Sequence, residues 1–157
     1  MLQLGESEGA WCAEGDLRHY FYQIRLVEDL GGVFSILDPG GQALQGKVLL
    51  MGFSWAPIIA QQLAATMAVA SLAAKESWFV SVSTSGDHTI APGQVDIFRS
   101  SDRDKVVARI FIYIDNFLVV AGSRETCDEV ADAVEAGARG INAVWKIPPL
   151  QKSGLRR

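Results

Sequence analysis

The stretch 109–120 constrains the fold of this chain more than any other, because it places two β-rich runs on either side of a single polar pair. The runs Ile110 to Ile114 and Phe117 to Val120 flank Asp115 and Asn116, a spacing typical of a β-hairpin with a tight turn. Asp and Asn also favour such turns for backbone reasons alone, since both tolerate positive φ and hydrogen-bond their own backbone. The stretch therefore predicts a rigid hairpin with a carboxylate at its tip, and an ordinary turn is the alternative interpretation.

A helix is predicted to begin at Pro57, because proline at the first helical position loses no hydrogen bond. The helix should continue to about Ala74. Ile59, Leu63 and Met67 lie four residues apart and are predicted to face a sheet. The same segment is the most membrane-like part of the chain, but its polar residues and many alanines favour a soluble, buried helix over a membrane span.

A second helix is predicted after Ser123, which is a good N-cap residue. Acidic residues at its start suit the positive end of the helix dipole. Its apolar positions recur at steps of three and four residues, which is typical of a helix that packs on a sheet. These positions are Cys127, Val130, Val134, Ala138 and Ile141.

Shorter segments are predicted to be strands. Val33 to Leu37 and Lys47 to Met51 lie on either side of a Gly-rich turn and predict an antiparallel pair. Ser77 to Ser85 alternates as a strand or extended connection would, and Val95 to Phe98 predicts a short strand. The order strand, hairpin, helix, hairpin, helix predicts the α+β class, with an antiparallel sheet and helices on one face.

Composition and charge set limits on the organisation of the chain. Its 157 residues are 49% hydrophobic and 20% charged, which is enough for one folded domain with a proper core. The formal net charge of -4 argues against strong autonomous binding to nucleic acid, because Lys and Arg on phosphates supply most of that affinity. We predict a flexible lead-in over residues 1–14, a folded core over residues 15–145 and a basic, mobile tail over residues 146–157.

The two cysteines point to a reducing compartment. Cys12 and Cys127 give neither a disulfide framework nor a metal-binding spacing, so free thiols are predicted. The N-terminus has no basic region followed by an apolar run, so no secretory signal is recognised. An intracellular location, nuclear or cytoplasmic, is therefore expected, with no membrane partner.

Two further blocks precede the hairpin and form an ordered set with it. In the first block, Asp16 is followed five positions later by Phe21 and then by the run Tyr22 to Ile24. In the second block, Gly52 to Pro57 forms a turn that leads into the predicted helix. The hairpin contributes the box Tyr113 to Asn116. Any one block could arise by chance, but the three in this order are specific.

In this order the blocks resemble motifs A, B and C of the reverse transcriptase palm. The chain is similar to the reverse transcriptases of DIRS- and VIPER-type retroelements, the latter known from trypanosomatids, and the resemblance covers roughly Gly15 to Trp145. It implies a polymerase palm, which is a ferredoxin-like antiparallel sheet with helices packed on one face. It also implies an RNA-directed DNA polymerase of a retrotransposon.

The resemblance implies that nucleotides are added by a two-metal mechanism. Asp16 and Asp115 would be the catalytic carboxylates and, with the backbone carbonyl of Leu17, the ligands of two Mg²⁺ ions, for which Mn²⁺ could substitute. The structural alternative is that Asp16 caps a turn and Asp115 fills one. Asn116 stands where most reverse transcriptases have a second Asp, so one negative charge is lost.

The resemblance also assigns substrate contacts to Phe21, Gly52, Tyr113 and Asn116. Phe21 would pack under the sugar of the incoming nucleotide and exclude a 2′-hydroxyl, or else be a plain core aromatic. Gly52 would let the backbone approach the nascent base pair, or simply allow a tight turn. Tyr113 would lie near the primer terminus or pack behind the turn. Met51 replaces a common Gln, so a template or nucleotide contact is predicted to be missing.

The expected partners are an RNA template with a DNA primer, and deoxynucleoside triphosphates. The family surrounds the palm with fingers, a thumb and often an RNase H domain, none of which is recognised in this sequence. These regions of a parent polyprotein are therefore further expected partners. The alternative function is a catalytically inactive palm remnant that serves as a structural or protein-interaction module.

Overall fold

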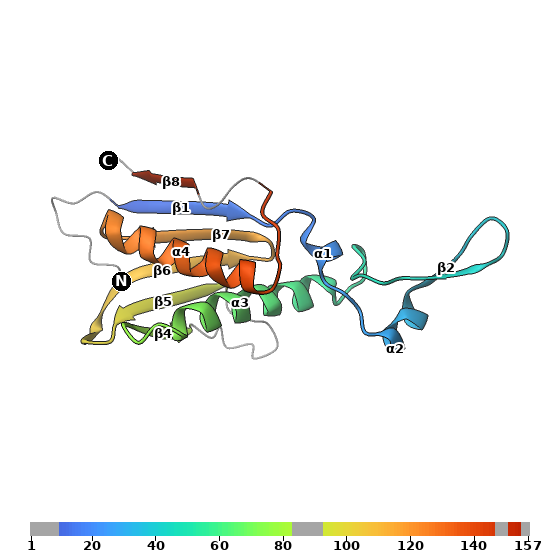
Figure 1. The fold of residues 1–157 in the computed structure, drawn as a ribbon, viewed down its shortest axis with the longest axis horizontal. Helices are drawn as coiled ribbons and strands as arrows, with labels where there is room; N and C mark the ends of the chain where they lie inside the picture. Colours follow the sequence, from blue (N-terminus) through green and yellow to red (C-terminus); the bar gives the residue numbers. More distant parts are fainter. Residues whose placement is uncertain (1–9, 83–92, 147–150, 155–157) are drawn as a thin grey trace.

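A six-stranded antiparallel sheet forms the main body of the computed structural model, which describes residues 10–82, 93–146 and 151–154 (Figure 1). The strands lie side by side in the order β4-β5-β6-β7-β1-β8. Their bounds are β1 Trp11–Asp16, β4 Trp78–Val82, β5 Gln94–Arg99, β6 Asp102–Tyr113, β7 Asn116–Ala121 and β8 Gln151–Gly154. The β6–β7 hairpin therefore lies directly beside β1.

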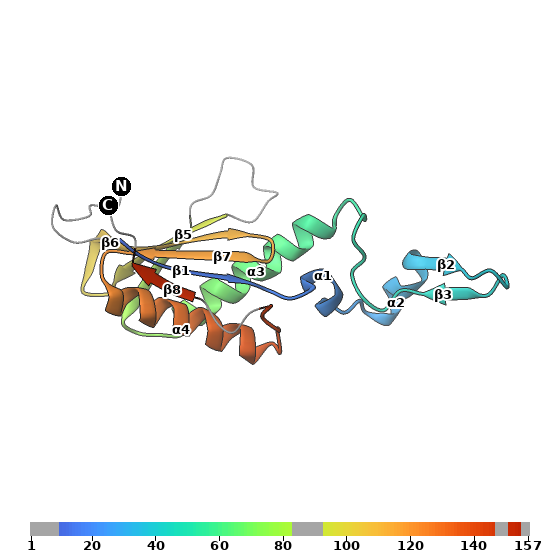
Figure 2. The ribbon, with the colours of Figure 1, turned by 90° about the horizontal axis from the view of Figure 1, so that it is seen from above.

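Two long helices, α3 (Ala56–Ala73) and α4 (Arg124–Gly140), pack against the sheet and against each other (Figure 2). α4 contacts β1, β6 and β7, whereas α3 contacts β4 and β6. Alternate residues of β6, namely Ala108, Ile110 and Ile112, are buried, as expected for a strand with one covered face. The predicted α+β class, an antiparallel sheet with helices, is confirmed.

α4 begins where the sequence predicts. Ser123 is its N-cap, and the Ser123 hydroxyl accepts a hydrogen bond from the amide of Thr126 at 3.2 Å. Four of the five predicted apolar positions are buried, and they are Cys127, Val130, Val134 and Ala138. Ile141 is exposed because it lies just beyond the last turn of the helix.

The buried face of α3 differs from the prediction. Met67 is buried, but the side chains of Ile59 and Leu63 are 37% and 42% exposed. The face that packs inward consists largely of small residues, including Ala56, Ala60, Ala64, Ala65 and Ala68. These let α4 approach closely: a Cβ on Gly137 would overlap the hydroxyl of Ser71 and lie 2.8 Å from its Cβ. The prediction was wrong because close helix packing selects small side chains over large ones.

By length and composition alone, α3 is long and apolar enough to cross a membrane. Its small residues nevertheless form a face that is buried within this structure, together with the polar side chain of Gln61.

The two predicted ends of the folded core also differ from the structure. β1 begins at Trp11, inside the predicted lead-in, because Trp11 to Glu14 pair with β7 and Ala13 is fully buried. β8 lies inside the predicted mobile tail and pairs antiparallel with β1. Residues 1–9 of the lead-in, and residues 147–150 and 155–157 of the tail, lie outside the described residues.

An arm projects from the main body between β1 and α3 (Figures 1 and 2). It contains α2 (Glu28–Gly31), the 3₁₀ helix η1 (Gly32–Phe34), and strands β2 (Ser35–Leu37) and β3 (Ala43–Gln45). The predicted pairing of residues 33–37 with residues 47–51 was wrong: an antiparallel pair does form here, but β2 pairs with β3. The reason is a tighter turn, in which Asp38 accepts a hydrogen bond from the amide of Gln42 at 2.8 Å.

The other predicted strands match in part. β4 occupies the described part of the predicted segment 77–85, of which residues 83–85 lie outside the described residues. β5 contains the predicted segment 95–98. β6 is longer than the predicted run from Ile110 to Ile114, because it already begins at Asp102.

Candidate active site

The end of β1 and the β6–β7 hairpin bring the two predicted catalytic residues together. Asp16 is the last residue of β1, and it pairs with Asn116, the first residue of β7. The amide of Leu17 donates a hydrogen bond to the backbone carbonyl of Asp115 at 2.9 Å. The sheet thus holds carboxylates from two distant parts of the sequence at adjacent strand ends.

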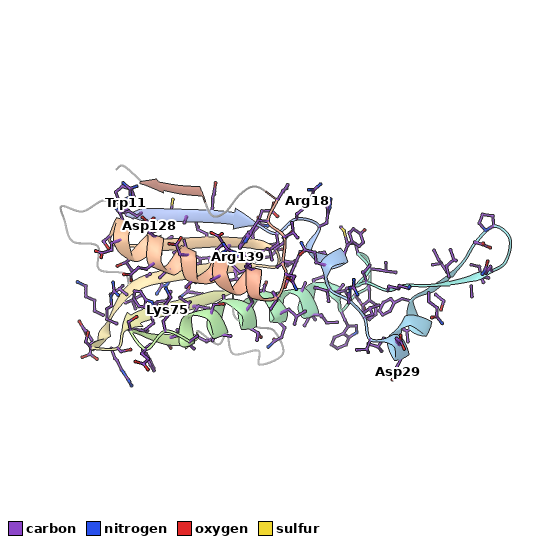
Figure 3. All side chains as sticks on the ribbon, viewed as in Figure 1. Trp11, Arg18, Asp29, Lys75, Asp128 and Arg139 are labelled. Carbon is purple, nitrogen blue, oxygen red and sulfur yellow. The ribbon has the colours of Figure 1, made fainter. Side chains whose placement is uncertain are left out.

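Both carboxylates line one cavity of about 590 Å³. Its other lining residues come from the end of β1, from α1 (Tyr20–Gln23) and from two later segments, and they are Leu17, Arg18, His19, Tyr20, Phe21, Tyr22, Met51 and Lys146. Figure 3 shows Arg18 at the point where β1 leads into α1. Acidic and basic side chains share this cavity, so it suits an anionic ligand that arrives with a cation.

Phe21 and Leu17 contribute to this cavity in different ways. Phe21 is partly buried and packs against the core, yet it also lines the cavity. Phe21 is thus in part a core aromatic, and its contact with the sugar of a nucleotide stays a prediction. The side chain of Leu17 is buried, so a role of Leu17 at the cavity falls to its backbone.

Tyr113 and Asn116 line a neighbouring cavity of about 450 Å³, which shares Asp16 and Lys146 with the first. The side chain of Tyr113 is 73% exposed, which excludes the interpretation that it packs behind the turn. The side-chain amide of Asn116 donates a hydrogen bond to Oδ1 of Asp115 at 3.1 Å. Asn116 thus contacts the carboxylate of Asp115 directly.

Gly52 is not among the lining residues of these cavities, although its neighbour Met51 is. Its φ of +94° is a conformation that favours glycine, and a Cβ added to it would meet no heavy atom within 4 Å. The tight turn accounts for the glycine here, and an approach of this backbone to a nascent base pair stays a prediction.

The hairpin turn is centred one residue earlier than predicted. Tyr113 pairs with Asn116, so Ile114 and Asp115 form the turn in place of Asp115 and Asn116. Ile114 has a φ of 58°, which a β-branched residue rarely adopts. Its amide donates a hydrogen bond to Oε1 of Gln61 on α3 at 2.6 Å. Sequence reasoning missed Gln61, because nothing local to the hairpin indicates a partner on a distant helix.

Lys146 is the second residue that sequence reasoning missed, since it was assigned to a mobile tail. Its Nζ lies 2.9 Å from Oδ2 of Asp16, and its amide donates to the backbone carbonyl of Asp16 at 2.8 Å. The hydrogen bond to Asp16, and then the charges of Asp16 and Asp115, raise the pKa of Lys146. The sequence holds only a weak signal for this role of Lys146, a single Lys after Trp145. In the structure, Trp145 forms a β-bridge with Leu17 and so places Lys146 beside Asp16.

Tyr20 connects the segment that follows Asp16 to α3 by a hydrogen bond. Its hydroxyl donates a hydrogen bond to the backbone carbonyl of Ala60 at 3.3 Å. Burial, and then the negative charge of Asp115, raise the pKa of Tyr20 to about 12. Both causes favour the neutral phenol, so Tyr20 remains a hydrogen-bond donor at neutral pH.

The donor chemistry of the cavity fits Mg²⁺ in part. Within the described residues, no group of three or more His, Cys, Asp or Glu side chains is arranged to hold a metal ion. Mg²⁺ commonly uses one or two protein carboxylates and takes its other oxygens from water and substrate phosphates. Asp16 and Asp115 are such a pair, and both line the same cavity.

Neither the protein-family models nor the curated proteins contain a match to this chain. Its function must therefore be argued from the site.

Proposed function

We propose that this chain is the palm of a reverse transcriptase from a DIRS- or VIPER-like retroelement, which adds deoxynucleotides to a DNA primer on an RNA template. One observation carries this proposal: Asp16 and Asp115, predicted from separate motifs, line one cavity that Phe21 also lines. The hydrogen bond from Leu17 to Asp115 fixes the two segments against each other.

The order of the strands supports the proposal. When α1, the arm and the strands β4 and β5 are left out, the remaining elements β1, α3, β6, β7, α4 and β8 read β-α-β-β-α-β along the chain. In the sheet, these four strands lie in the order β6-β7-β1-β8. This order is compatible with the ferredoxin-like arrangement that the resemblance implies for a polymerase palm. β4 and β5 extend the sheet beyond β6.

Backbone conformation gives independent support. His19 and Ile114 have φ angles of 49° and 58°, and each lies within three residues of one of the two carboxylates. Such conformations cost about 1–3 kcal/mol and cluster at functional sites, where the surrounding structure holds them. Their position here supports a functional role for the cavity between them.

The residues of the cavity have distinct roles in the proposed reaction. Asp16, Asp115 and the backbone carbonyl of Leu17 would hold two Mg²⁺ ions, which activate the primer hydroxyl and neutralise the leaving pyrophosphate. Phe21 would restrict the space beside the sugar and so favour a deoxyribose. Lys146 offers a cation next to Asp16, where it offsets negative charge before the substrate and its metal arrive.

A second candidate function is a palm remnant without catalytic activity, kept as a structural or protein-interaction module. Two observations favour it. Asn116 provides an amide where a second carboxylate is expected, and this amide already binds Asp115. Lys146 already forms an ion pair with Asp16. Both contacts would have to change when a metal ion binds.

Primer extension on an RNA template distinguishes the two functions. We expect the chain, supplied with Mg²⁺ or Mn²⁺ and deoxynucleoside triphosphates, to extend a DNA primer. Asp16→Ala and Asp115→Ala should each lower the rate by at least about a hundredfold, because a metal ligand is lost. Asp104→Ala is the matched control, since Asp104 is exposed and belongs to β6 far from the turn.

Loss of extension in both cavity variants, with activity kept in the control, would establish a working palm. Extension that survives both substitutions would show that another enzyme is responsible. If the parent chain does not extend a primer, alone or joined to fingers and thumb regions of such an element, the remnant function is favoured.

A further inference from the structure

We infer that Gln61 is a positioning residue, which holds the Asp115 turn against the strand that carries Asp16. Its significance for metal binding rests on the proposed function, but the hydrogen bonds that carry the inference do not. Gln61 belongs to the second turn of α3 and touches neither Asp16 nor Asp115 through any contact described above.

The burial of Gln61 shows that its amide has a specific task. Its side chain is 7% exposed, and Thr126 is the other buried polar side chain within the described residues. A buried amide costs free energy unless its hydrogen bonds are made. An apolar side chain would fill this position without that cost, so the amide is explained by what it binds.

Both ends of the amide bind the backbone of the hairpin. Nε2 of Gln61 donates a hydrogen bond to the carbonyl of Ile112 at 3.1 Å, and Oε1 accepts one from the amide of Ile114 at 2.6 Å. These two backbone groups lie on either side of Tyr113, immediately before Asp115. Gln61 therefore hydrogen-bonds the backbone of the hairpin on both sides of Tyr113, where β6 enters the turn.

The turn needs such support because Ile114 is strained. Its φ of 58° is unfavourable for a β-branched side chain. The hydrogen bond that the Ile114 amide donates to Oε1 of Gln61 favours this conformation. When the bond is lost, we expect the turn to relax and Asp115 to move with it.

α3 also holds the opposite side of the cavity. The carbonyl of Ala60, one residue before Gln61, accepts a hydrogen bond from Tyr20 in α1. The Asp115 turn is also bound to the residue that follows β1, because the amide of Leu17 donates a hydrogen bond to the Asp115 carbonyl. Two adjacent residues of one helix thus set the spacing between the segments that carry the two carboxylates.

Hydrogen exchange of single amides tests this inference without any metal or substrate. The test variant is Gln61→Met, which fills the same volume but cannot bind the hairpin. We expect the protection of the Ile114 amide to fall roughly tenfold, the scale of one lost hydrogen bond. The decisive readout is the Leu17 amide, which we expect to lose protection as well, because its acceptor is Asp115.

Three comparisons separate positioning from a general loss of stability. The amides of Val130 and Val134 in α4 should keep their protection in Gln61→Met. Gln61→Glu keeps an acceptor for Ile114 and should preserve more of the protection of that amide. Gln62→Met alters the exposed neighbour on the same helix and should change nothing.

The inference is overturned if the Leu17 amide keeps its protection in Gln61→Met, or if the α4 amides lose protection to the same degree. Mn²⁺ affinity, measured in parallel, tests the link to the proposed function. If the parent chain binds no Mn²⁺, the proposed function fails, while the exchange experiment still decides whether Gln61 positions the turn. If the parent binds Mn²⁺, we expect Gln61→Met to weaken that binding by roughly tenfold.

Discussion

Single residues decide the electrostatics of the cavity, and Tyr20 gives the clearest consequence for pH. Its pKa rises from the ordinary value of 10.0 to about 12 on folding, because of burial and then the charge of Asp115. The unfolded chain therefore releases this proton at a lower pH than the folded chain does. The raised pKa of Tyr20 therefore stabilises the folded chain in full below pH 10. This stabilisation is lost as the pH rises towards 12, so the free energy of unfolding falls across that range.

Tyr20→Phe should flatten this part of the pH dependence, because the titrating group is removed. Denaturant unfolding between pH 9 and 12 measures the free energy of unfolding of each variant. Tyr22→Phe is the matched control, since Tyr22 is 49% exposed and should leave the slope unchanged. If the slope were the same in Tyr20→Phe and in the parent, the raised pKa of Tyr20 would not be the cause of this pH dependence.

The sequence motifs predicted some residues of the cavity, whereas the conformation of the hairpin turn depends on a residue far away in the sequence. Asp16, Phe21 and Asp115 were predicted from their motifs, and all three line one cavity. The turn of the hairpin was placed one residue late, because Asp and Asn are the favoured turn residues whereas Ile114 is not. The amide of Ile114 is bound by Gln61, and a contact from so distant a part of the chain leaves no local signal.

At the scale of elements, the contact between α3 and α4 determines which residues are buried. The prediction followed the larger side chains of α3, but the helices approach through alanines and Gly137. Helical periodicity reports that a helix has an apolar face, and it does not report how closely a neighbour packs. In contrast, the N-cap of α4 depends on local hydrogen bonds, and it was predicted correctly.

The substitution Gly137→Ala tests this close approach. Its new Cβ would overlap Ser71, so we expect the free energy of unfolding to fall by about 1–3 kcal/mol. Gly140→Ala is the control, because a Cβ there meets no heavy atom within 4 Å. Thermal and denaturant unfolding would measure both. Equal stability of Gly137→Ala and Gly140→Ala would show that the helices can separate without cost.

At the scale of the whole molecule, the body and the arm make different contributions. The body supplies the sheet, the two helices and both carboxylates, and its core is continuous. The arm exposes large apolar side chains such as Val33, Ile36 and Leu37. It leads back to the cavity through Met51, which lines the cavity just before α3 begins. An antiparallel sheet with helices was predicted for the body, whereas the pairing of β8 with β1, inside the predicted mobile tail, was not.

The proposed function requires that Asp16 and Asp115 together bind a divalent metal ion. Paramagnetic broadening of amide resonances by Mn²⁺ tests it most directly. We predict that substoichiometric Mn²⁺ broadens the amides around both residues at once, and that Asp16→Ala and Asp115→Ala each abolish the effect at both places. Broadening confined to the acidic surface of α4, or unaffected by either substitution, would contradict the claim.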